Sequence, residues 1–572
     1  MKILLCCTTI EDAHRSEDNH DSHYPLGLAY LQSYIEQQSP QHEFENLYLN
    51  NVPYEECFSE IKESLERFQP DVLGVSLMTH SRVSAYRIIE YVHKTYPNIK
   101  IVAGGMHVTV MWKQFVEKYP YVTVVQGEGE VTFNELINCF ESGGSYEDVV
   151  GLAYWKDDKV KFTGGRALIK DLDMLPFPRH DIFLYEGKTM ANLLTSRGCP
   201  YKCNFCVLDA MSRRKVRFRS GENIADEVEQ LLEQCPTVNT IWIHDDAFMI
   251  NKKRTIEFCD SIIERGIKTK FVASARFRPI SPEVVSKMEQ AGFIHVLFGL
   301  ESGADSVQKG MKKGITKEHA RYALSLIAKT KIKATAFLIS GLPGETQETI
   351  NETVDFVQEL QKLHYIFYDE MGMAMIYPGT EMYTMAKATG MIDDEYWLTD
   401  KGVPYYTTEN GGAHSYDQLF NWKEEIRESV SLGKFFTPGG FLAQRKLMPE
   451  ILRYSDSHGL SGILKIMGEA INSTGLVSKI VQNSLQKEPK NMLPQISKTT
   501  EKFMIKAMFN QYAEFFDIKE KKRFMKAYDD QVKADNIKLK QYEERINSIS
   551  YDADADEGDI KYESKVTLPL IQ

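Results

Sequence analysis

One short loop constrains this chain more than any other stretch. Within residues 195–208, three cysteines, Cys199, Cys203 and Cys206, follow a C-x3-C-x2-C spacing. Thiolates that lie so close can bind three irons of an iron–sulfur cube, because soft thiolate ligands suit iron. The fourth iron then has no protein ligand and can accept a small molecule, as an open zinc position does. The spacing therefore predicts a 4Fe-4S cluster with one open corner.

Two other interpretations of the three thiols fit the sequence less well. A zinc site needs a fourth Cys or His at a familiar spacing, and none follows the loop. A disulfide would leave one thiol unpaired and suits an oxidising compartment. The last of the nine cysteines is Cys259, so the C-terminal part cannot hold a further cysteine-ligated cluster.

This cysteine loop resembles the hallmark of the radical S-adenosylmethionine (SAM) superfamily, in which the position of Phe205 is usually aromatic. The resemblance implies that SAM chelates the open iron through its amino and carboxylate groups. It also implies that Phe205 belongs to the SAM site.

Charge and hydropathy exclude several classes of partner. The net charge of −12 argues against a nucleic acid as the main partner. No apolar run is long enough to span a membrane. Residues 1–5 lead straight into a strand-like stretch and lack the layout of a signal peptide, so we expect a cytoplasmic protein.

Residues 1–150 alternate short apolar runs with helical stretches, which predicts an α/β, doubly wound (Rossmann or flavodoxin-like) parallel sheet. The expected strands are 2–7, 71–77, 101–107 and 122–125, and the expected helices are 54–67, 83–95 and one that begins near Pro25. Ligands of such sheets bind beyond the carboxyl ends of the strands. The pair Gly104-Gly105 and the loop at Gly127 follow two of these strands.

Together with the cysteine loop, residues 24–30, 103–107 and 127–130 resemble the cobalamin-binding domain that precedes many radical SAM domains. The resemblance spans roughly residues 1–390 and places Gly104, Gly105, His107 and Gly127 at the cobalamin. His107 also fits a loop histidine satisfied within the protein. The spacing from Asp21 through His23 to Gly27 is one residue longer than the D-x-H-x-x-G that supplies a cobalt ligand, so we expect His23 to be a loop residue.

We expect residues 151–188 to form a hairpin and a linker, and residues 189–390 to form a partial (βα)6 barrel. Its expected strands are 193–196, 240–244, 270–275, 296–300, 334–339 and 371–376. SAM contacts are expected at the strand exits, where the candidates are Asp245, Arg276, Glu301 and Gly341. Arg276 offers a guanidinium that matches a carboxylate, although Arg278 is close by.

The remaining segments carry less information. The basic run 213–219 is typical of a solvated face. The aromatic-rich segment 391–415 is either a lid over the substrate or ordinary packing against the barrel. We expect residues 391–548 to be mainly helical and the acidic tail, residues 549–572, to be disordered.

The resemblance implies a cobalamin-dependent radical SAM enzyme that methylates an unactivated carbon of a small-molecule or lipid- or tetrapyrrole-like substrate through a 5′-deoxyadenosyl radical. It also implies an electron donor such as flavodoxin or ferredoxin. An oxidative cyclase without methyl transfer is the second interpretation. A non-catalytic iron–sulfur sensor or scaffold is an alternative of another class.

Replacement of a cluster ligand separates the enzymatic interpretations from the sensor. Cys199→Ala should abolish SAM cleavage, because the cluster that donates the electron loses one of its three thiolates. Chromatographic measurement of 5′-deoxyadenosine after anaerobic incubation with SAM checks this. Cleavage by the variant at the unmodified rate would contradict the cluster assignment, whereas a sensor would cleave no SAM in either form.

Overall fold

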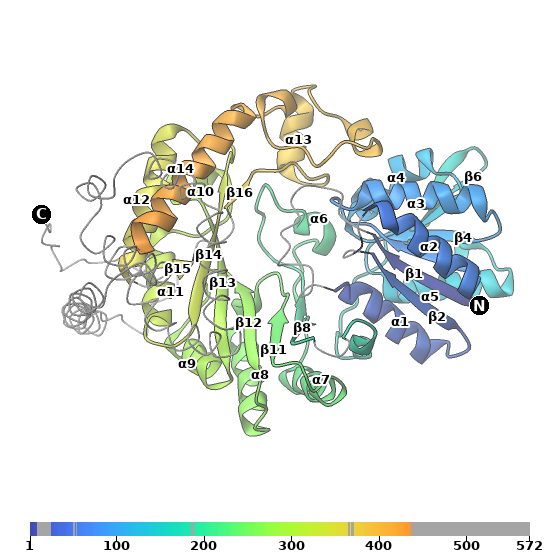
Figure 1. Cartoon of the computed structure of the whole chain (residues 1–572), viewed down its shortest axis with the longest axis horizontal. Coiled ribbons are helices and arrows are strands. Elements are labelled where there is room, and N and C mark those ends of the chain that lie inside the picture. Colours follow the sequence, from blue (N-terminus) through green and yellow to red (C-terminus); the bar gives the residue numbers. More distant parts are fainter. Residues whose placement is uncertain are drawn as a thin grey trace, which may run out of the picture.

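The computed structural model describes residues 1–8, 24–49, 52, 54–184, 188–363, 366–367 and 371–435 (Figure 1). Two parallel sheets lie side by side, one in the N-terminal third and one in the middle of the chain. His23, the greater part of the expected C-terminal helical region and the acidic tail lie outside the described residues.

The N-terminal sheet has the order β2-β1-β3-β4-β5-β6-β7. Its strands are β1 (Lys2–Cys7), β2 (Glu43–Tyr48), β3 (Val72–Ser76), β4 (Lys100–Gly104), β5 (Val122–Val125), β6 (Leu152–Lys156) and β7 (Lys159–Phe162). The first five strands are parallel in the flavodoxin-like order 2-1-3-4-5, and the last two are antiparallel. The doubly wound prediction is confirmed.

Helices cover both faces of this sheet, and each face has its own core. These helices are α1 (Leu26–Gln38), α2 (Tyr54–Phe68), α3 (Arg82–Thr95), α4 (Met106–Lys118) and α5 (Gly129–Ser142). One apolar cluster joins the sheet to α2, α3 and α4, and another joins it to α1 and α5. The fully buried strand residues explain why β1, β3 and β5 read as continuous apolar runs.

Two features of the N-terminal sheet differ from the expectation. Strand β2 was missed, because Glu43-Phe-Glu-Asn-Leu-Tyr48 is a half-exposed edge strand without an apolar run. The hairpin β6–β7 pairs with β5 instead of standing apart, so the sheet extends to Phe162, beyond the boundary expected at residue 150.

The second sheet is a half-barrel in which every strand pair is parallel. Its strands are β8 (Met190–Leu193), β11 (Thr240–Ile243), β12 (Lys270–Ala275), β13 (Phe293–Glu301), β14 (Lys333–Ser340), β15 (Ile366–Phe367) and β16 (Met371–Met373). Both β15 and β16 pair with β14 and share the sixth position. The partial barrel prediction is confirmed, although the first strand ends at Leu193 instead of Ser196.

Helices of the half-barrel lie on its outer face and contribute to one large apolar core. They are α7 (Gly221–Gln234), α8 (Lys252–Glu264), α9 (Pro282–Gln290), α11 (Lys317–Ile327) and α12 (Gln347–Leu363). The short helix α10 (Asp305–Gly310) instead contributes Val307 to a separate apolar cluster. Helices α13 (Glu381–Ala388) and α14 (Tyr416–Phe435) follow the last strand. None of the described helices combines the length and apolar composition that a membrane crossing requires.

The aromatic-rich segment 391–415 packs against the N-terminal domain as well as the barrel. Trp397 is fully buried, and the guanidinium of Arg82 from α3 stacks on its ring at 5.2 Å. The Nε of Arg82 donates to the Trp397 carbonyl (3.3 Å). Gln114 of α4 donates to Asp394 (2.9 Å). The described contacts therefore favour packing over a lid, and this packing involves the N-terminal domain as well as the barrel.

Gly105 and its neighbour Gly104 allow a stability test, because a Cβ would clash at the first position and not at the second. Its φ is +96°, and a Cβ there would lie 2.7 Å from the carbonyl oxygen of Leu77, which already accepts the His107 N–H. Gly105→Ala should destabilise the N-terminal domain by about 2 kcal/mol or more. Gly104→Ala, whose Cβ would meet nothing within 4 Å, should change stability by less than about 0.5 kcal/mol. Thermal unfolding of both variants measures the difference, and equal midpoints would contradict the close approach at Gly105.

Candidate functional site

The cysteine loop projects from a small antiparallel ribbon at the carboxyl end of β8. The ribbon consists of β9 (Ser196–Arg197) and β10 (Arg217–Phe218), and α6 (Leu208–Ser212) lies within the loop that it closes. Gly198 precedes the first cysteine with φ +94°, and a Cβ there would lie 2.3 Å from the Lys215 carbonyl oxygen. Glycine is required here because the two ends of the loop pass in direct contact.

The three thiols lie close enough to influence one another. Burial, together with Cys203, Cys199 and Asp246, raises the pKa of Cys206 to about 11. Burial also raises the pKa of Cys199, and Cys203 adds to that shift. A cysteine binds iron as the thiolate, so metal binding at this loop would release these protons.

No group of three or more His, Cys, Asp or Glu side chains in the described ranges is arranged around one metal ion. In a cubane cluster each thiolate binds a separate iron, and three cysteines from one loop can supply three of its four ligands.

Asp245 accepts hydrogen bonds from the two residues at which the cysteine loop begins. Its carboxylate accepts hydrogen bonds from the Thr195 N–H (2.6 Å), the Ser196 N–H (3.1 Å) and the Ser196 hydroxyl (2.6 Å). Arg254 lies 3.5 Å away. The sequence predicted Asp245 as a SAM contact, whereas the contacts that the structure gives to both oxygens of this buried side chain are with the protein itself.

Its neighbour Asp246 lies on the open side of the sheet. Asp246 accepts the Gly198 N–H (3.0 Å), and its remaining surface is exposed. Burial by the surrounding loops, together with Asp245, raises the pKa of Asp246 to about 6. Asp246, and not Asp245, is therefore the carboxylate that a ligand beside the thiols would meet.

Arg276 at the end of β12 lies next to the cluster loop. Its guanidinium stacks 3.6 Å from the Tyr201 ring, and its Nη1 lies 3.8 Å from the Cys203 Sγ. Its Nη2 donates to the Lys313 carbonyl, whereas its buried Nε has no protein acceptor. Arg276 thus keeps a positive charge and one unused N–H near the thiols, as a ligand carboxylate would require.

Glu301 at the end of β13 forms a buried ion pair with Lys313. Its φ is +64°, which is uncommon for a residue with a side chain. The pair lies directly over Gly299, where a Cβ would lie 2.5 Å from either charged atom. The Lys313 Nζ also lies 5.9 Å from the Phe205 ring. The structure therefore brings Phe205, Arg276 and Glu301 together, as the sequence predicted.

Lys313 was missed because it follows Lys312 in a polar turn, and its sequence gives no sign that only one of the two is buried.

Gly341 does not face open space. A Cβ at this position would lie 2.6 Å from the side chain of Leu419, which α14 places over the end of β14. The Gly341 N–H donates to Glu345 (2.6 Å). The sequence predicted that Gly341 lets an adenine approach the backbone, but in the structure Leu419 makes that approach.

The cobalamin candidates separate into two groups. Gly104 and Gly127 lie at the carboxyl edge of the N-terminal sheet, with nothing within 4 Å of their Cβ positions. Gly105 contacts Leu77, and His107 lies in the first turn of α4, fully buried and hydrogen-bonded to Tyr86 (2.9 Å) and Thr79 (3.3 Å). Because partners within the domain contact both ring nitrogens, the structure favours the other interpretation of His107, a histidine satisfied within the protein.

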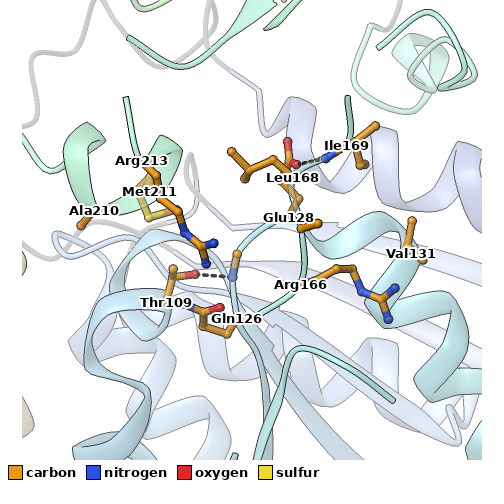
Figure 2. Close-up of a pocket in the computed structure, with 12 residues that line it drawn as sticks. Thr109, Gln126, Glu128, Val131, Arg166, Leu168, Ile169, Ala210, Met211 and Arg213 are labelled. Atoms are coloured by element: carbon orange, nitrogen blue, oxygen red, sulfur yellow. Dashed lines mark hydrogen bonds between the residues drawn. The ribbon is translucent and has the colours of Figure 1, made fainter. Parts of the chain in front are cut away.

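A hollow separates this edge from the cysteine loop (Figure 2). Its lining comes from the loop after β5, the linker at residues 166–169 and helix α6. Figure 2 shows Arg213 reaching from α6 toward Thr109 and Gln126. Gly127 at the edge of the N-terminal sheet and α6, the helix that follows the cysteines, therefore line opposite parts of one hollow between the two domains.

The basic run 213–219 is only partly a solvated face. Arg214 and Lys215 are exposed. Arg219 forms an ion pair with Glu227 (2.5 Å) in which both side chains are at most 5% exposed, and Arg217 pairs with Glu128 (2.8 Å). The expectation of a solvated face is therefore wrong for these two arginines.

Two family models match the chain. The B12 binding domain model matches residues 20–137, and the Radical SAM superfamily model matches residues 193–357. These ranges coincide with the doubly wound sheet and with most of the half-barrel.

Several known proteins are similar to this chain in sequence or in fold. An uncharacterized methyltransferase of Pyrococcus horikoshii, PH0819, is 30% identical over 403 residues, which cover 69% of this chain and 85% of the relative. The anaerobic magnesium-protoporphyrin IX monomethyl ester cyclase of Cereibacter sphaeroides is 30% identical over 51% of this chain, and the match spans half of the cyclase. A solved structure of the cobalamin-dependent SAM radical enzyme OxsB has a TM-score of 0.62 at 19% identity, covering 89% of this chain and 84% of OxsB, which shows a shared fold.

The buried His107 predicts a pH dependence of stability. Burial, assisted by Arg82, lowers the pKa of His107 to about 3, whereas an unfolded histidine has a pKa of about 6.5. Between pH 6.5 and pH 3 the unfolded protein therefore binds one proton at this histidine that the folded protein does not bind. The free energy of unfolding consequently falls as the pH falls below about 6.5. Between pH 6.5 and 5.0, the unmodified protein should lose about 1.5 kcal/mol more than His107→Gln. Denaturant unfolding at both pH values measures this difference, and parallel losses would contradict a buried neutral His107.

Proposed function

Because the chain belongs to the radical SAM enzymes that carry a B12-binding domain, we propose that it is a cobalamin-dependent radical SAM methylase of an unactivated carbon. One observation carries the proposal: Gly127 at the carboxyl edge of the N-terminal sheet and helix α6, which follows the three cysteines in the closed loop, line the same hollow. Both cofactors would then reach one substrate.

The described residues have distinct tasks in this proposal. Cys199, Cys203 and Cys206 hold the cluster, which supplies the electron that converts SAM to a 5′-deoxyadenosyl radical, while cobalamin supplies the methyl group. Arg276 and the pair Glu301–Lys313 bind and orient SAM through its charged amino-acid end.

The cobalamin wall has its own residues. Gly104 and Gly127 leave room for the corrin ring against the backbone. Loops from both domains and the linker surround the reaction space and exclude water from it.

The proposal includes the cellular setting expected from the sequence. The enzyme works in the cytoplasm, takes electrons from a flavodoxin or ferredoxin, and acts on a small molecule of lipid, tetrapyrrole or related type. The similarity to the porphyrin ester cyclase favours oxidative ring formation as the second candidate.

Anaerobic reconstitution with iron, sulfide and cobalamin tests the proposal. The protein should retain both cofactors, with spectra of a 4Fe-4S cluster and of a corrinoid, and should convert SAM to 5′-deoxyadenosine. With substrate, a methylase also produces S-adenosylhomocysteine, whereas a cyclase produces none. A reconstituted protein without bound cobalamin would contradict the methylase, and one that binds a cluster without cleaving SAM would indicate the sensor.

A further inference from the structure

One carboxylate of the N-terminal domain joins three segments of the chain. Glu128 lies in the loop between β5 and α5, next to Gly127. It accepts hydrogen bonds from Arg197 (3.0 Å), from Arg217 (2.8 Å to each oxygen) and from the Ile169 N–H (2.8 Å). Arg217 also donates to the Ile169 carbonyl (2.8 Å), so the linker is part of the same unit.

The two arginines are neighbours across the ribbon that closes the cysteine loop. Arg197 on β9 is the register partner of Arg217 on β10, so two positive charges face each other. Their side chains are 18% and 10% exposed. Like charges directly opposite one another destabilise a strand pair, and poor access to water increases this cost. The negative charge of Glu128 contacts both guanidinium groups and offsets part of this repulsion.

This contact lies between the two candidate cofactor positions. Arg197 is two residues before Cys199, and Glu128 directly follows Gly127 on the glycine-lined edge. Glu130 adds a second carboxylate to Arg197 (2.6 Å), and the guanidinium of Arg197 stacks on Tyr30 at 5.2 Å. The base of the cluster loop is thus fixed on the cobalamin side through charged groups whose geometry is specific.

We propose that Glu128, by neutralising Arg197 and Arg217 together, is a positioning residue that sets the separation between the cluster and the cobalamin. The proposal rests on the proposed function only for the identity of the two cofactors. The opposite side of the interface is held by other contacts, His80 with Tyr377 (2.8 Å) and Arg82 with Trp397. Loss of the Glu128 charge should therefore loosen one edge without separating the domains.

Glu128→Gln tests this proposal, because it keeps the shape of the side chain and removes only the charge. In the reconstituted holoenzyme, the reduced cluster and cob(II)alamin are both paramagnetic, and their dipolar interaction in electron paramagnetic resonance reports their separation. The variant should keep full iron and corrinoid content but show a weakened or broadly distributed interaction. It should also form at least tenfold more 5′-deoxyadenosine per S-adenosylhomocysteine than the unmodified enzyme.

Two further variants control for stability and charge. Glu147→Gln removes an ion pair of similar length, Glu147 with Lys156 (2.7 Å), on the exposed surface of the same domain, and should leave the interaction unchanged. Glu128→Asp keeps the charge and should restore at least part of the interaction. A dipolar interaction in Glu128→Gln equal to that of the unmodified enzyme would overturn the proposal.

Hydrogen exchange of the protein without cobalamin makes the inference independent of the proposed function. In Glu128→Gln, amides of residues 126–130 and 195–198 should exchange at least tenfold faster, while those of residues 80–86 and 394–401 keep their rates. Unchanged exchange at residues 126–130 and 195–198 would refute the positioning role of Glu128. Absence of cobalamin from the unmodified protein, by contrast, would refute the proposed function alone.

Discussion

Charged groups with little access to water between the two sheets determine the geometry on which the site depends. On one side, Arg197 and Arg217 meet Glu128, and on the other, Arg82 meets the carbonyl and ring of Trp397. Buried ion pairs add little net stability compared with apolar packing, but removal of one partner is strongly destabilising. Contacts of this kind therefore fix the relative position of the domains more than they hold them together, and a site built from both domains requires such fixing.

Much of the architecture could be predicted from local patterns. The apolar runs of β1 and β5 define strands whose ends agree with the structure, because both faces of a parallel strand are covered. Periodicity failed at β2, an edge strand whose sequence Glu-Phe-Glu-Asn-Leu-Tyr has neither a continuous apolar run nor a regular alternation. The cysteine spacing indicated the cluster loop because its ligands are local in sequence, and the resemblance built on it correctly identified the family.

The side chains around the loop were harder to predict because their roles depend on long-range contacts. Asp245 and Asp246 are adjacent, yet one supports Thr195 and Ser196 and the other faces the open side. His107 follows a glycine pair at a strand end, as a ligand contact would, but Tyr86 from another helix satisfies its ring. Glu128 and Arg217 are 89 residues apart, and nothing in either local sequence indicates that they pair.

The ribbon β9–β10 also affects how the protein acquires its metal. Since the ribbon closes both ends of the cysteine loop and Asn204 within it bonds to Met311 (3.1 Å) and Met382 (2.9 Å), the backbone that carries the thiols is tethered by contacts that involve no metal. Iron that binds to such a loop has to order little of the backbone. Little of the binding free energy is therefore used for chain ordering, and most of it appears as affinity for the metal. Metal loading and chain folding are thereby largely uncoupled, in contrast to zinc fingers, which fold only around their ion.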